Sequence, residues 1–114
     1  DDHAKNFAFL MDKSGKWTLS PAYDITYSKG LATQHITTIG GKALEITKDD
    51  ILKIATSYSI KPAVANKIIR KCIKVATTFK ERAEALGLED YDIEKYKNDI
   101  DSQIKFLSWF YSIP

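Results

Sequence analysis

The chain has 114 residues, of which 44% are hydrophobic and 28% are charged, which places it in the ordinary soluble globular class at the usual size of one domain. Its 17 basic and 15 acidic residues leave a formal net charge of +2, too small an excess to indicate a nucleic acid or an anionic membrane surface as a partner. The single cysteine, Cys72, excludes an intrachain disulfide, and no apolar run is long enough to span a bilayer, so the composition predicts a cytoplasmic protein.

The first predicted element is a β-hairpin. A short apolar stretch at residues 7–11 is followed by a turn-like sequence at 12–15 and by a second strand candidate at 16–19. Pro21 has no N–H to donate to a strand ladder, so the second strand should end there. Asp24 is therefore expected on a loop just beyond the hairpin.

A glycine-rich connection and a helix follow the hairpin. Residues 28–43 contain three of the five glycines and predict irregular structure, with a brief strand at residues 35–38. Thr47 and Asp50 then form a capping-box-like start, because the threonine oxygen can accept from a free helix N–H and an acid favours the positive end of the helix. This helix should run to Tyr58.

Two longer helices are predicted in the rest of the chain. Pro62 announces the second, which should run to Leu86 and stop at Gly87, and its apolar positions recur every three or four residues: Val64, Ile68, Cys72, Val75, Phe79, Ala83 and Leu86. Asp90 or Asp92 should start the third, which should end by Pro114. Its apolar stripe is Ile93, Tyr96, Ile100, Ile104, Leu107 and Tyr111.

The residues that suggest chemistry stand at the start of the chain. Asp1 and Asn6 lie five positions apart just before the first predicted strand, which is the spacing of the kinase catalytic loop. In that loop the aspartate accepts the proton of the substrate hydroxyl and the asparagine holds magnesium, while a second aspartate beyond a hairpin binds magnesium at the phosphates. Asp24 lies where this second aspartate is expected.

The surrounding sequence makes this pattern specific. The motif Asp-x-His-x-Lys-Asn, a Phe-x-Phe-Leu strand, a Gly-Lys-Trp turn and the block Leu-Ser-Pro-Ala-Tyr-Asp-Ile occur in order. Together they resemble the signature pair of HipA-like serine/threonine kinases, the toxins of bacterial toxin–antitoxin systems. The resemblance implies that Asp1 is the catalytic base, that Asn6 and Asp24 are magnesium ligands, and that Lys5 lies near the phosphate of ATP.

The resemblance also implies a setting for the chain. It suggests ATP-dependent phosphorylation of a protein serine or threonine, an antitoxin as partner and an aminoacyl-tRNA synthetase among the substrates. No Gly-rich phosphate loop or strand lysine can be assigned, and in the family these belong to an N-terminal kinase lobe upstream. The isolated chain is therefore expected to be inactive. Two alternatives are a non-catalytic helical module that binds an antitoxin or another protein, and a small-molecule kinase with the same loop chemistry.

The fold class that follows is α+β and mostly helical, similar to the C-lobe of a kinase. A catalytic β-hairpin should precede a bundle of about three helices. We expect one partial domain over residues 1–114, with the catalytic loop, hairpin and metal-binding loop at 1–34, an irregular connection at 35–46 and a helical subdomain at 47–114.

Several other residues have simpler interpretations. Asp2 is the rival for the role of base, but the five-residue spacing selects Asp1. His3 has no second His or Cys at ligand spacing, so it is predicted to be a hydrogen-bonding residue that shapes the loop. His35 belongs to no cluster of functional residues. Cys72 lies in an apolar stripe and is predicted to be a small buried hydrophobe.

Two surface features of the helices complete the analysis. A basic ridge on the second predicted helix is expected to be a solvated face, with an antitoxin, DNA phosphates or a tRNA-bearing substrate as alternative partners. It comprises Lys67, Arg70, Lys71 and Lys74. The aromatic residues at 109–111 are expected to pack in the core.

Overall fold

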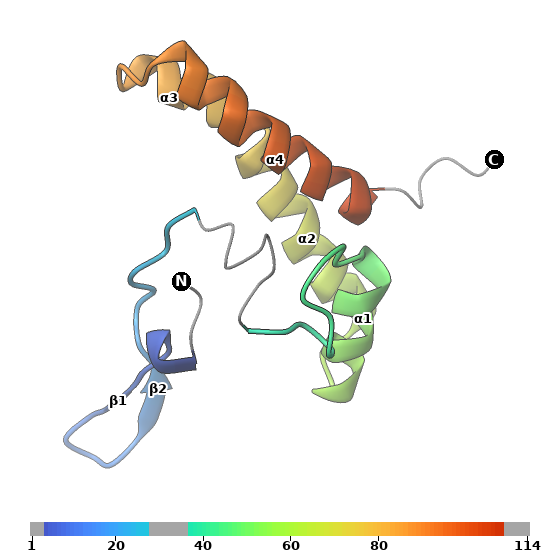
Figure 1. The fold of residues 1–114 in the computed structure, drawn as a ribbon. Coiled ribbons are helices and arrows are strands. Elements are labelled where there is room, and N and C mark those ends of the chain that lie inside the picture. The colour runs from blue at the N-terminus through green and yellow to red at the C-terminus, as the bar shows by residue number, and fades with distance from the viewer. Residues whose placement is uncertain (1–3, 28–36, 109–114) are drawn as a thin grey trace. The chain divides into compact units, whose positions relative to one another are not determined.

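The chain forms a small hairpin followed by helices in a computed structural model that describes residues 4–27 and 37–108 (Figure 1). The elements in chain order are a 3-10 turn η1 (Ala4–Asn6), strands β1 (Phe9–Met11) and β2 (Trp17–Leu19), and helices α1 (Lys48–Ser57), α2 (Pro62–Ala76), α3 (Phe79–Ala85) and α4 (Asp90–Ser108). The predicted α+β, mostly helical class is confirmed. The chain divides into two compact units between Leu44 and Glu45, and each is described by itself.

The turn of the hairpin is built around one carboxylate. Asp12 Oδ1 accepts hydrogen bonds from the Ser14 hydroxyl at 2.6 Å, the Ser14 N–H at 2.8 Å and the Lys16 N–H at 3.1 Å. Gly15 adopts a φ of +83°, a conformation that costs glycine little. These contacts fix the turn, and with it the register of the strands it joins.

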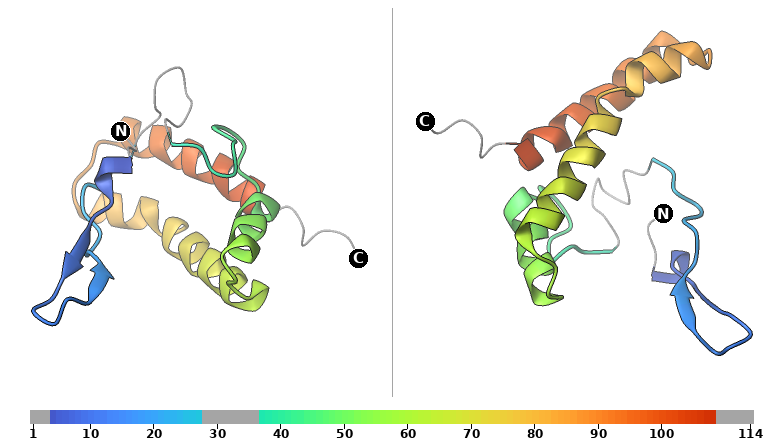
Figure 2. Two further views of the ribbon diagram at one scale, coloured as in Figure 1. Left: turned by 90° about the horizontal axis from the view of Figure 1, so that it is seen from below. Right: turned by 180° about the vertical axis from the view of Figure 1, so that it is seen from behind.

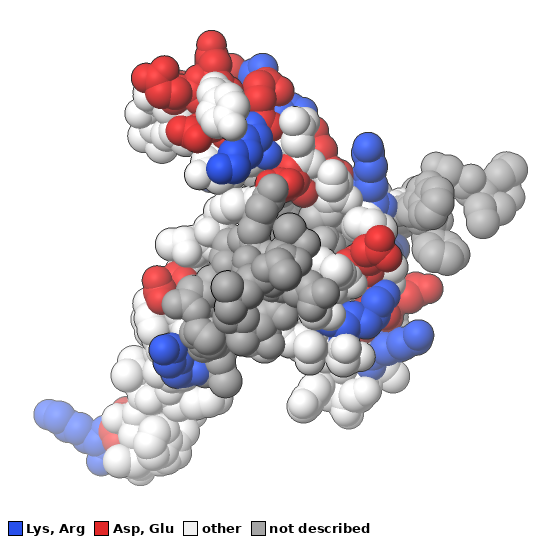
Figure 3. Space-filling view, in the orientation of Figure 1, with Lys and Arg blue, Asp and Glu red and all other residues white. Residues whose placement is uncertain are grey.

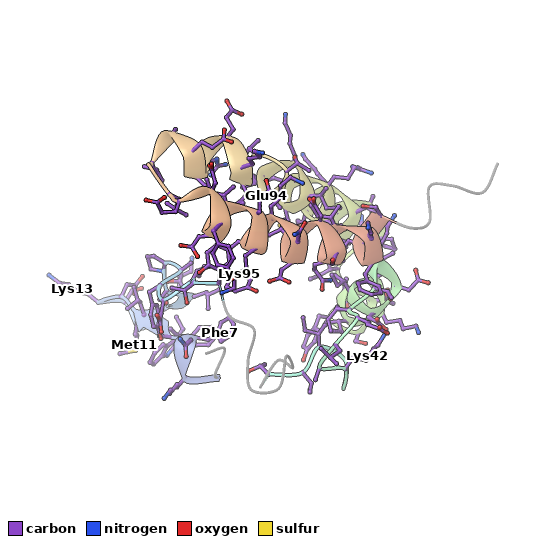
Figure 4. The ribbon with its side chains drawn as sticks, turned by 45° about the horizontal axis from the view of Figure 1, so that its top comes forward. Phe7, Met11, Lys13, Lys42, Glu94 and Lys95 are labelled. Atoms are coloured by element: carbon purple, nitrogen blue, oxygen red, sulfur yellow. The ribbon has the colours of Figure 1, made fainter. Side chains whose placement is uncertain are left out.

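The two strands pair antiparallel and place four of their five large apolar side chains on one face, while Leu10 lies on the other. Phe9 lies opposite Leu19 and Met11 opposite Trp17, and residues two apart in a strand share a face. All four side chains are more than half exposed. Met11, one of the four, is labelled on the hairpin in Figure 4. A two-stranded sheet with an uncovered apolar face is marginally stable by itself, so we expect the hairpin to depend on a further surface that covers this face.

The helical unit begins with the capping box that the sequence predicted. Thr47 Oγ1 accepts from the Asp50 N–H at 3.3 Å, and Asp50 Oδ2 accepts from the Thr47 N–H at 2.9 Å. The preceding residue, Ile46, is buried, and its carbonyl accepts a 3.0 Å hydrogen bond from Gln103 Nε2 of α4. This bond joins the start of α1 to α4 through two residues, Ile46 and Gln103, that are 57 positions apart.

The core of the helical unit is small and lies where the helices cross. Helix α1 packs on α2, α3 packs on α4, and α4 also contacts α1 and α2 (Figure 2). Ile93 of α4 is the most buried large side chain, at 1% exposed. Among the described residues, the other buried apolar side chains are Ile46, Ala55, Ala65, Ile69 and Ala83.

One predicted helix is in fact two. The sequence predicted a continuous helix from residue 62 to residue 86, but α2 ends at Ala76 and α3 begins at Phe79. Thr77 and Thr78 interrupt it, and their hydroxyls donate to the carbonyls of Lys74 and Val75 at 2.8 Å. Hydroxyl side chains that bond to nearby carbonyls offer the backbone an alternative to the helix, which explains the break.

The predicted buried stripe of α2 is also wrong. Val64 and Ile68 are about half exposed, and Cys72 is exposed rather than the buried hydrophobe that its stripe suggested. The buried positions are Ala65 and Ile69, one residue further along the helix. Helix α2 is apolar over a wide arc, and the face with the small Ala65 is the one that packs, because a small side chain lets helices approach closely.

Two neighbouring isoleucines test which face of α2 is buried. Ile69 is 6% exposed and Ile68 is 54% exposed. Ile69→Ala should lower the free energy of unfolding by about 2–4 kcal/mol because it leaves a cavity, whereas Ile68→Ala should lower it by less than about 1 kcal/mol. Urea denaturation of both variants measures the difference. A larger loss of unfolding free energy in Ile68→Ala than in Ile69→Ala would show that the buried stripe predicted from the sequence was right.

The hairpin turn should respond to acid. The hydrogen bond from the Ser14 hydroxyl, followed by those from the N–H groups of Lys16 and Ser14, holds the pKa of Asp12 below its ordinary value. The contribution of the carboxylate is therefore complete above about pH 3.9 and is lost as the pH falls through the lowered pKa. The Gly15 amide resonance should report this step. Asp12→Asn should abolish it and Asp49→Asn should not; a step that persists in Asp12→Asn would contradict the assignment.

Candidate functional site

A hydrogen bond between two distant residues defines the candidate site. Asn6 Nδ2, at the end of η1, donates to Asp24 Oδ2, on the loop after β2, at 2.7 Å. The two residues are eighteen positions apart, and the hairpin between them reverses the chain so that they meet. The prediction that the hairpin brings Asn6 and Asp24 together is confirmed.

Two further contacts hold the same segments together. The Tyr23 hydroxyl donates to the backbone carbonyl of Lys5 at 3.0 Å, and the Ser20 N–H donates to the carbonyl of Ala8 at 2.9 Å. The Ser20 bond continues the pairing beyond the strands. The Tyr23 bond then anchors the peptide group immediately before Asn6.

The backbone at Asp24 is in the left-handed region, with a φ of +53°. Most side chains are disfavoured there, but aspartate and asparagine tolerate this conformation better than others. In an extended segment neighbouring side chains point to opposite sides. At this bend Tyr23 and Asp24 instead contact the adjacent residues Lys5 and Asn6.

The donor set of the site suits a hard cation. Asn6 offers an amide oxygen and Asp24 a carboxylate, and their mutual bond uses Nδ2 and Oδ2, so it does not occupy the Oδ1 atom of either residue. Magnesium is commonly held by one or two protein oxygens and completes its shell with waters and phosphate oxygens. The residues therefore fit a magnesium–phosphate group.

A metal held by His, Cys, Asp and Glu side chains alone does not fit the described residues. Within 4–27 and 37–108, no three or more His, Cys, Asp or Glu side chains gather in a way that could hold a metal ion. A structural zinc site would need four such ligands in tetrahedral geometry. Any ion at Asn6 and Asp24 would need ligands from elsewhere.

The other predicted site residues have different outcomes. Lys5 lies on η1 with its side chain exposed, next to Asn6. Asp1, Asp2, His3 and His35 lie outside the described residues, as do residues 109–111. Their predicted roles stay predictions.

Tyr23 is the residue that sequence reasoning did not single out. It appeared only as part of the Pro-Ala-Tyr-Asp block that carried the resemblance. Its position beside a predicted ligand was the one available signal. Its bond to a backbone carbonyl leaves no trace in the sequence, because any residue could supply the acceptor.

These observations define a mostly helical α+β chain with an amide–carboxylate pair joined across a hairpin. A family model described as the HipA-like C-terminal domain matches residues 1–99. The chain belongs to this family, as its opening motifs indicated. Searches of curated proteins and of solved structures gave no match. In the part of the chain that the structure describes, no helix is both long and apolar enough to cross a membrane.

The bond that defines the site predicts a local effect on backbone stability. Asn6→Ala removes the 2.7 Å contact and should accelerate amide hydrogen exchange at residues 20–24 several-fold, since one hydrogen bond contributes about 1 kcal/mol. The matched control is Asn66→Ala, because the Asn66 amide donates to the Pro62 carbonyl in the first turn of α2, outside the hairpin unit. Unchanged exchange at 20–24 in Asn6→Ala would show that the contact does not hold the loop.

Proposed function

We propose that the full protein is a kinase that transfers phosphate from ATP to a serine or threonine of another protein, with magnesium at Asn6 and Asp24. The observation that carries this proposal is the direct contact of these two residues in a chain of the HipA-like C-terminal family. The same two residue types face each other across a hairpin in kinases, where they serve as metal ligands.

Each side chain of the site has a role in this proposal. The Asn6 amide oxygen and the Asp24 carboxylate would hold magnesium, which when bound supplies positive charge at the phosphate oxygens. Lys5 would place its ammonium group near phosphate as a mobile point charge. Asp1 would orient the incoming hydroxyl and accept its proton at a carboxylate oxygen.

The proposal requires a second part of the protein. Nucleotide binding would come from an N-terminal kinase lobe, so this chain alone should not turn over ATP. In this proposal the lobe would also cover the exposed apolar face of the hairpin. By family, we extend the proposal to a toxin–antitoxin system in the cytoplasm, with an antitoxin as partner and an aminoacyl-tRNA synthetase among the protein substrates.

The surface of α2 favours a second candidate, an interaction module. Residues 51–80 contain seven basic residues and no acid, whereas residues 81–101 contain eight acids and three bases. The acidic side chains gather where α3 meets α4 (Figure 3). The predicted basic ridge is exposed beside the exposed Val64 and Ile68. A charged ridge beside an apolar stripe is typical of a protein-binding surface.

Three substitutions in the full-length protein, Asp1→Asn, Asp24→Asn and Asp2→Asn, separate the kinase from the interaction module. Asp1→Asn should reduce phosphoryl transfer by about 10²–10⁴-fold and leave nucleotide affinity within about twofold, because the base contributes to transfer and not to nucleotide binding. Asp24→Asn should weaken both, because it removes the charge that would hold the metal. Transfer rates with a protein substrate and nucleotide affinity are measured side by side.

Asp2→Asn is the control for the choice of base and should retain activity. Loss of transfer in Asp2→Asn with full activity in Asp1→Asn would show that the wrong acid was chosen. Full activity in all three variants would refute the catalytic site. Transfer to a small molecule and not to protein would identify the small-molecule kinase instead.

A further inference from the structure

We infer that Tyr23 is a positioning residue that fixes Asn6 and Asp24 in the geometry of a shared metal site. This inference rests on the proposed function and adds a residue to it. The Tyr23 hydroxyl donates to a backbone carbonyl of η1. Its neighbour Asp24 instead accepts a hydrogen bond from a side chain of the same turn.

The argument begins with the position of the two bonds. Tyr23 and Asp24 are adjacent, and they bind Lys5 and Asn6, which are also adjacent. The Lys5 carbonyl that Tyr23 binds belongs to the peptide group that carries the Asn6 nitrogen. The Tyr23 hydroxyl therefore acts on the backbone that determines where the Asn6 side chain starts.

A single bond between Asn6 and Asp24 would not fix either residue. Both ends of that bond are side chains with rotatable torsions, so the pair could move together over an exposed surface. The second bond, from a rigid phenol to a backbone carbonyl at 3.0 Å, fixes the main chain of η1 relative to the loop. With both bonds in place, the backbone positions from which the two side chains start are held relative to each other.

The backbone conformation at Asp24 allows Tyr23 and Asp24 to contact η1 at the same time. The left-handed conformation there, with φ +53°, turns the chain so that successive side chains reach the same turn. Such a conformation persists where surrounding contacts stabilise it, and the Tyr23 bond is a contact of this kind. A ligand pair held in place before binding loses less freedom when a metal binds.

Tyr23→Phe in the full-length protein tests the inference because it removes the hydroxyl and keeps the ring. The apparent affinity for magnesium, measured at saturating ATP in the transfer assay, should fall about threefold to tenfold, the range that loss of one neutral hydrogen bond produces. The maximal rate at saturating magnesium should change less than twofold. Tyr91→Phe is the matched control, since Tyr91 lies on α4 and is 80% exposed.

A double-mutant cycle separates positioning from a general effect on stability. In an Asn6→Ala background, Tyr23→Phe should change the magnesium affinity less than twofold, because its effect acts through Asn6. If Tyr23→Phe lowered the magnesium affinity by the same factor with and without Asn6→Ala, the two residues would act independently and the inference would be overturned. An unchanged magnesium affinity in Tyr23→Phe when Asn6→Ala weakens it would also overturn the inference, and that result would leave the proposed function standing.

A second readout applies if the protein shows no kinase activity or if Asn6→Ala leaves the magnesium affinity unchanged. Either result would contradict the proposed function, and the resonances of the Asn6 side-chain amide then decide the role of Tyr23. A shift of these resonances in Tyr23→Phe and not in Tyr91→Phe would support positioning. Unchanged resonances in both variants would overturn it.

Discussion

The contact between Asn6 and Asp24 is the constraint on which the account of the site depends. It exists because the chain turns back on itself at Asp12, whose carboxylate gathers three hydrogen bonds and sets the strand register. A slip of one residue would change which residues of the loop after β2 lie beside η1. The hydroxyl of Tyr23 adds a bond to the backbone beside Asn6. A short hairpin thus positions a site without a large core.

Local patterns in the sequence predicted the features that depend on a few neighbouring residues. The hairpin followed from an apolar run, a turn and Pro21, and the start of α1 followed from Thr47 and Asp50, because each of these signals lies within a few positions. The meeting of Asn6 and Asp24 could also be predicted, since a hairpin returns the chain over a known distance.

The features that the sequence did not predict depend on contacts between elements. Helix α2 is apolar on two adjacent faces, and packing against α1 and α4 selected the one with Ala65 and Ile69. Periodicity alone cannot make that choice. The same limit explains why Cys72, which is exposed, was predicted to be buried. The bond from Tyr23 was missed because its acceptor is a backbone carbonyl, which has no side-chain identity.

The most direct test of the central claim is to place a paramagnetic ion at the site. Manganese accepts the same oxygen ligands as magnesium, and its nucleotide complex broadens nearby resonances. In the full-length protein, the account predicts that the resonances of Asn6 and Asp24 broaden first, and that those of Asp12 and Asp50 broaden later or not at all. Broadening centred at Asp12 or Asp50, or none at Asn6 and Asp24, would contradict the claim that this pair binds the metal.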